Sequence, residues 1–176
     1  KLLSSDGTFT PLGLDNINAD SGKVTDLTFK PVINSRNLAL VLTSDQPIVA
    51  AVKSSGVLNG VEEFAWSNPV AELKNLIIHL GGLRPDIVFQ GKNFEVDITW
   101  TDRNNKIRSK TIQGKELASW RPAKGVSKVE FRTANSQVYA GAIFLEKTGV
   151  SYLPLVAGAQ LESAAIPSVD ASVITR

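Results

Sequence analysis

The chain has a single histidine and no cysteine, which leaves few ways to assemble a catalytic or metal centre. His79 lies in the apolar run Leu76–Leu80, which has the length and composition of a β-strand. A Ser-His-Asp triad needs a histidine held by an acid and touching an activated serine, and no serine here has a nucleophile-elbow setting. A zinc site would need three carboxylates beside this one imidazole. We therefore interpret His79 as a structural strand residue and expect no catalytic residue, metal site or cofactor.

Carboxylates are the next candidates for chemistry. Glu62, Glu63, Asp97 and Asp102 could supply the acid and base of a glycoside hydrolase, but no spacing points to a shared cleft. Each is more simply a solvated strand or turn residue. The loop Asp15–Asp20 has oxygen-bearing residues at alternate positions, but neither register gives the sixth-position Gly and twelfth-position Glu of a helix-loop-helix calcium loop. A hydrolase is therefore the least favoured function, and we favour a polar turn at Asp15–Asp20, with calcium binding left open.

Three tryptophans remain as candidate ligand contacts, because exposed indole rings stack on sugars as well as on core neighbours. Trp100 is in phase with the apolar side of the segment Phe94–Trp100, so it is predicted to lie in the core. Trp66 and Trp120 are flanked by polar residues, and these two are the candidate ligand-binding residues. Core packing is the alternative for both, and Trp66 is the better candidate for exposure.

The composition is that of an ordinary globular chain, with 176 residues, 43% apolar and 20% charged. A formal net charge of +2 is too small to imply a nucleic-acid partner. The basic residues Lys106, Arg108 and Lys110 alternate with others, as on the solvent face of a strand. No apolar run approaches the roughly 20 residues of a membrane helix. The absence of Met predicts a processed form or a fragment, so that any targeting segment or membrane anchor would lie upstream of Lys1.

Short β-branched runs with period-two alternation, separated by turns, predict an all-β fold of the antiparallel sandwich type. Only Asn68–Leu73 and Gly114–Trp120 have some helical character, and neither is long enough to form a helix alone. The expected strands include Leu38–Thr43, Ile48–Lys53, Leu76–Leu80, Phe94–Trp100, Lys106–Ile112, Val126–Arg132 and Gln137–Leu145.

An internal repeat divides the chain. The triplet Phe29-Lys30-Pro31 matches Trp120-Arg121-Pro122, and the apolar positions that follow align without a gap until Val52 meets Ile143. After a short indel, Phe64 aligns with Tyr152. Repeats of this size correspond to whole structural units. We therefore predict two related antiparallel β-sandwich-like units, residues 1–73 and residues 74–176 with a C-terminal strand.

The first predicted unit lacks its leading strands, because Lys1 lies almost on the turn at Asp6-Gly7. An incomplete sandwich exposes an edge of unpaired backbone groups, so we expect the strand near Lys1 to lack one neighbour. The alternating segment Val169–Thr175, or a strand upstream of Lys1 on a separate piece, would complete the sheet.

The run Leu40–Val52, followed by Glu63-Phe-Ala-Trp66 and Pro69, resembles an actinobacterial family of exported or membrane-tethered β-rich proteins whose function is unknown. The matching segments cover about a third of the chain. Pro47 and Trp66 have no counterpart in the second unit. This difference argues against a role for these two residues that both units share. The resemblance implies an extracellular or cell-envelope location and brings no catalytic residues with it.

These observations favour a non-enzymatic extracellular or cell-envelope module that acts through protein contacts or as a structural spacer. The alternative is a module that binds envelope glycans through Trp66 or Trp120.

Overall fold

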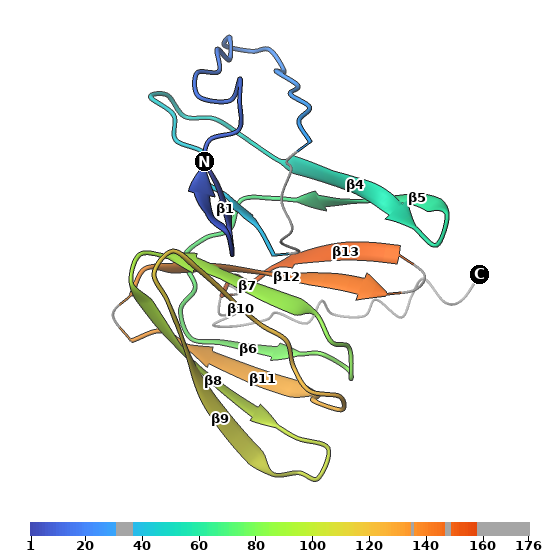
Figure 1. Cartoon of the computed structure of the whole chain (residues 1–176). Helices are drawn as coiled ribbons and strands as arrows, with labels where there is room; N and C mark the ends of the chain where they lie inside the picture. Colours follow the sequence, from blue (N-terminus) through green and yellow to red (C-terminus); the bar gives the residue numbers. More distant parts are fainter. Residues whose placement is uncertain (31–36, 135, 147–148, 158–176) are drawn as a thin grey trace, which may run out of the picture.

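Two four-stranded antiparallel sheets pack face to face in the computed structural model, which describes residues 1–30, 37–134, 136–146 and 149–157 (Figure 1). The described residues contain thirteen strands and no helix. The predicted all-β, sandwich-like fold class is confirmed. One sheet has the order β10 (Leu117–Trp120), β7 (Asp86–Gly91), β12 (Val138–Glu146) and β13 (Gly149–Pro154); the other has the order β6 (Leu76–His79), β11 (Lys128–Arg132), β8 (Phe94–Thr101) and β9 (Ile107–Gly114).

The sandwich core forms because alternate residues of each strand point between the sheets. In β8, Phe94, Val96 and Ile98 are buried, as the alternation predicted, while the intervening acidic residues are exposed. Phe89 of one sheet meets Phe131 of the other edge to face, with ring centroids 5.9 Å apart. Aromatic contacts of this kind add to the burial energy of the rings.

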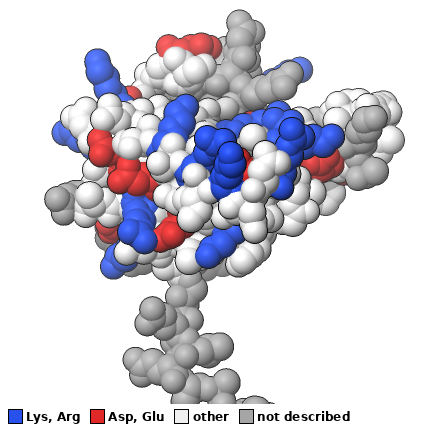
Figure 2. Space-filling model, turned by 90° about the horizontal axis from the view of Figure 1, so that it is seen from below, with Lys and Arg blue, Asp and Glu red and all other residues white. Residues whose placement is uncertain are grey.

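The outer face of the β6-β11-β8-β9 sheet is polar, and side chains on it hydrogen-bond to one another between neighbouring strands. Thr111 donates a hydrogen bond to Asp97 at 2.6 Å, and Gln113 donates to Glu95 at 2.7 Å. Seen from below, the molecule carries basic and acidic side chains interspersed (Figure 2). Charges of both signs therefore share this side of the molecule.

The strands before residue 70 form two small single-layer sheets. One has the order β2 (Gly7–Phe9), β1 (Leu2–Ser4), β3 (Ala39–Leu40); the other is the hairpin of β4 (Val52–Leu58) and β5 (Val61–Ser67). The first sheet is tied to the sandwich near β10, where Asn37 donates to Ser119 at 2.9 Å and Thr8 donates to Glu116. The hairpin lies above the sandwich, with β5 beside β13 and running in the same direction (Figure 1).

Several expectations for the first unit are corrected. The strand near Lys1 does not lack a neighbour, because β1 is the central strand between β2 and β3. Of the predicted strand Leu38–Thr43 only β3 forms, and of Ile48–Lys53 only Val52 and Lys53 belong to a strand. Alternation alone does not supply the partner strand that a ladder needs. The segment Gly114–Trp120 is not helical: it ends β9 and forms β10.

The repeat does not extend to equivalent pairing. Phe29 lies outside the strands, whereas Trp120 ends β10. The matched segments both form hairpins, β4–β5 and β12–β13, but Tyr152 pairs with Ile143 while Phe64 pairs with Ser55. The residue-by-residue superposition is therefore wrong, because similar spacing of apolar residues is compatible with different registers. The proposed boundary between residues 73 and 74 stays a prediction, and Val169–Thr175 lies outside the described residues.

Candidate functional site

The β4–β5 hairpin is shaped by its turn. Asn59 and Gly60 both have positive φ, 51° and 81°, and Leu58 pairs with Val61 to close a two-residue loop. Asn-Gly is the preferred sequence for a type I′ turn, whose twist matches that of the flanking strands. The register of the whole hairpin follows from this loop.

One face of the hairpin carries two exposed aromatic rings. Directly opposed residues in an antiparallel pair share a face, so the pairs Lys53–Trp66, Ser55–Phe64 and Val57–Glu62 lie on the same side. We call these six residues the hairpin aromatic face. Trp66 is 56% exposed, Phe64 51% and Val57 76%. Exposed apolar side chains that lie next to one another mark contact surfaces more often than scattered ones do.

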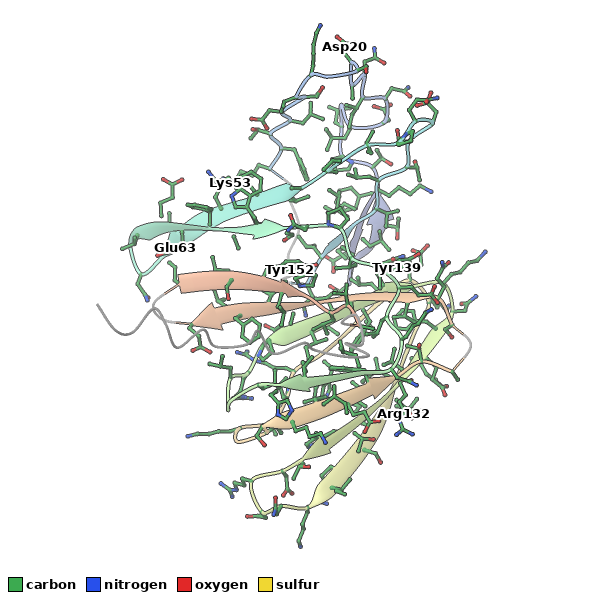
Figure 3. All side chains as sticks on the ribbon, turned by 180° about the vertical axis from the view of Figure 1, so that it is seen from behind. Asp20, Lys53, Glu63, Arg132, Tyr139 and Tyr152 are labelled. Carbon is green, nitrogen blue, oxygen red and sulfur yellow. The ribbon has the colours of Figure 1, made fainter. Side chains whose placement is uncertain are left out.

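Lys53 lies over the hairpin aromatic face, with its Nζ 4.6 Å from the centroid of the Phe64 ring (Figure 3). A cation in this position is attracted by the ring quadrupole. Glu62 is at the other end of the face, two residues before Phe64 on the same strand. The face thus combines two aromatic rings with one basic and one acidic group, which suits contact with a mixed polar and apolar surface.

The other candidate tryptophan, Trp120, is in the core. It is 9% exposed, its ring centroid is 5.4 Å from that of Trp100, and it meets Phe131 edge to face. Its ring therefore has no open face on which a sugar could stack. Core packing, which the sequence analysis gave as the alternative to ligand binding, describes this residue. Trp66 keeps its exposed ring.

The residues considered for acid–base or metal chemistry lie apart. His79 is exposed on β6, opposite Lys128 of β11. Asp20 pairs with Lys23 at 2.9 Å, at the far end of the N-terminal loop from Glu63 (Figure 3). Across the described residues, no three His, Asp or Glu side chains are grouped closely enough to hold a metal ion. No long apolar helix that could cross a membrane occurs in this part of the chain.

Asp102 organises the turn between β8 and β9. Its carboxylate accepts hydrogen bonds from the backbone N–H groups of Lys106 at 3.0 Å and Asn104 at 2.8 Å, and from Arg108 Nε at 3.2 Å. These donors lower the pKa of Asp102, with the Lys106 N–H contributing most. Through these three local donors the Asp102 carboxylate holds the turn between β8 and β9 together.

Tyr152 is the second residue whose side-chain pKa is shifted. Burial raises the pKa of its phenol above the usual value of 10.0. Its ring covers Gly141 of the neighbouring strand β12, and a Cβ at Gly141 would lie 2.6 Å from ring atoms of Tyr152. The shift therefore reflects packing of the ring against the sheet.

Two shallow hollows lie on the surface of the sandwich. The larger, about 560 Å³, is lined by β12, β13 and Leu83, with Phe144 and Leu153 among its apolar residues. The smaller, about 380 Å³, lies where β8 begins and β9 ends, around Phe94. The smaller hollow includes Glu95 and Lys115 in its lining, and the larger includes Glu146, Ser151 and Tyr152.

The sequence identified Trp66 but missed Phe64. The signal was present: Phe64 and Trp66 are two residues apart in a strand entered through Asn59-Gly60, which puts both rings on one face. No family model, curated protein or solved structure matches the chain.

Proposed function

We propose that this chain is a non-catalytic β-sandwich module that acts through protein contacts made by the hairpin aromatic face. The observation that carries the proposal is the exposure of Phe64 and Trp66 side by side on the β4–β5 hairpin, which lies beside β13 of the sandwich (Figure 1). Aromatic residues are enriched at protein interfaces, where their large rings become buried.

The surrounding region supports this proposal. Of the eighteen exposed large hydrophobic residues among those described, twelve precede residue 70, whereas only Leu2 and Leu3 are buried in that region. Large contiguous apolar patches are rare on monomeric soluble proteins and mark interaction sites, and Val57, Phe64 and Trp66 lie together on one face of the hairpin. The resemblance of Leu40–Val52 to an envelope-associated family extends the proposal to a module outside the cytoplasm.

Site-specific photo-crosslinking tests the proposal even when the identity of the partner is unknown. We would replace Phe64 with the photoreactive analogue p-benzoylphenylalanine and irradiate cells that make the protein. The matched control places the same analogue at Ile107, which is 76% exposed on β9 of the sandwich. We expect a protein adduct of defined mass from position 64 that is missing from position 107. The same adducts from both positions, or none from either, would contradict the proposal.

Glycan binding is the second candidate function, and the exposed ring of Trp66 beside the polar groups of Lys53, opposite it, and Ser55, diagonal to it, favours it. A pyranose ring could stack on the indole while these groups hydrogen-bond its hydroxyls. Titration with soluble envelope oligosaccharides, followed by tryptophan fluorescence, tests this. A saturable change that is lost in Trp66→Ala but kept in Trp120→Phe would support it, and no change at millimolar sugar would exclude it.

A further inference from the structure

We propose that the open edge of β4 pairs with β4 of a second copy of this chain, antiparallel and centred on Ser55. The inference deepens the proposed function and rests on it, because it names a partner for the β4–β5 hairpin. Three features of β4 support it: the direction of its backbone groups, its weak protection and its self-complementary sequence.

The hairpin turn determines which backbone groups of β4 point away from β5. In a two-residue hairpin the closing pair, here Leu58 and Val61, is hydrogen-bonded, and bonded and non-bonded pairs then alternate along the ladder. Lys53, Ser55 and Val57 therefore belong to the non-bonded pairs. Their N–H and C=O groups point away from β5, toward an edge that no other strand of the described residues occupies.

The edge of β4 is long and has few features that would prevent another strand from pairing with it. It has seven residues, no proline and one charged residue, Lys53. By comparison β9, which also ends its sheet, carries Arg108 and Lys110, while the edge strands β6 and β10 have four residues each. Charges and short length are the devices that keep sheet edges from pairing with other chains. The β4 edge is longer than β6 and β10, and it carries one charge where β9 carries two.

The sequence of β4 is self-complementary in one register. An antiparallel alignment centred on Ser55 is the only one that pairs all seven residues of β4. In it, Val52 of each copy lies opposite Leu58 of the other copy. It places Lys53 opposite Val57 of the second copy, so no two like charges face each other. Shifting the centre to Lys53 would oppose two ammonium groups and leave much of the strand unpaired.

Pairing in this register would join the two hairpins into one four-stranded sheet, with β5 strands outermost. On the aromatic face, Lys53 would lie in one row with Glu62 of the second copy, about 10 Å away between backbones, which two long side chains can bridge. On the opposite face, Val52 would stand directly beside Leu58 of the second copy, so that each of these two apolar side chains would cover part of the other.

The absence of cysteine makes the register directly testable by cross-linking. In Ser55→Cys the two thiols would face each other with Cα atoms about 5.5 Å apart, within disulfide range. In Lys53→Cys or Val57→Cys the like positions would be about 14 Å apart. We expect mild oxidation to give a disulfide dimer of S55C and of the double variant K53C/V57C, and neither single variant at 53 or 57 to dimerise.

A second measurement uses proline. Ser55→Pro removes an N–H that points to the open edge, so it leaves the ladder with β5 intact and should abolish association. Light scattering over a concentration series should show dimer formation by the wild-type chain and only monomer for S55P.

Two results would overturn self-pairing. One is a wild-type chain that stays monomeric over the whole concentration series, and the other is S55C cross-linking no better than K53C. If Phe64 photo-adducts then contain another protein, the proposed function stands and only the identity of the partner is wrong. If there are no adducts either, both proposals fail.

Discussion

The sandwich of residues 73–157 and the region before residue 70 have the same kind of alternating sequence, but they differ in how far their apolar side chains are buried. In the sandwich, Phe89, Val96 and Phe131 are fully enclosed between two sheets. In the N-terminal region, the hairpin is a single layer, and Phe64 and Trp66 face outward. Alternation sorts side chains onto two sides of a strand, but burial needs a second layer opposite one of those sides.

The largest expected difference between the two regions concerns a phenylalanine in each. Phe89→Ala should lower the free energy of unfolding by about 3–5 kcal/mol, because it removes a ring enclosed in the core and leaves a cavity. Phe64→Ala should change it by less than about 0.5 kcal/mol in dilute solution, because its ring is half exposed. Urea denaturation followed by circular dichroism measures both. A large loss for Phe64→Ala in the monomer would show that the hairpin aromatic face is covered by the chain itself.

Two strand glycines give a smaller contrast. Gly141→Ala should destabilise by about 1–3 kcal/mol, because the new methyl group would overlap the ring of Tyr152. Gly56 of β4 has no atom within 4 Å of an added Cβ. Gly56→Ala should therefore be neutral or stabilise by up to about 1 kcal/mol, since it restricts the unfolded chain. Thermal melts of the two variants compare them, and equal losses would mean that the hairpin is as tightly packed as β12.

The smallest effect is a titration at high pH. The pKa of Tyr152 is raised by burial, so the folded chain holds this proton more tightly than the unfolded chain does. Its contribution to stability is complete below pH 10 and is lost as the pH rises through the folded pKa. In Tyr139→Phe, Tyr152 is the remaining tyrosine, so absorbance at alkaline pH reports it alone. We expect the titration midpoint of Tyr152 to fall to the ordinary value when urea unfolds the chain. The same midpoint with and without urea would show that packing in the folded chain does not cause the pKa shift.

Five of the eight strands of the sandwich, β6, β8, β9, β11 and β12, could be predicted from sequence because each has a strong local signal, whereas β7, β10 and β13 were missed. Phe94–Trp100 and its partner Lys106–Ile112 are joined by a short turn, and both appear close to the predicted bounds as β8 and β9. The N-terminal region could not be predicted as well. Its pairing joins β1 to β3 across a long loop, and such non-local contacts leave no periodic trace in the sequence.

The candidate site was predicted in part. Trp66 was identified from its polar neighbours, but the same criterion also selected Trp120, which is in the core. Polar neighbours in a strand lie on the opposite face from the residue they flank, so they say little about its own exposure. The open edge of β4 depends on which strands are absent beside it, and a single strand's sequence does not contain that information.

The tilted contact of Trp100 and Trp120 has an optical consequence. The rings come from β8 and β10, which belong to different sheets, and they meet at 5.4 Å with planes inclined by 46°. Two indoles held this close and at an angle couple their excited states and give a paired positive and negative band in circular dichroism. This exciton signal requires the sheets to be docked, whereas the backbone signal requires only that strands form. The chain therefore carries its own spectroscopic reporter of sheet docking, separate from strand formation.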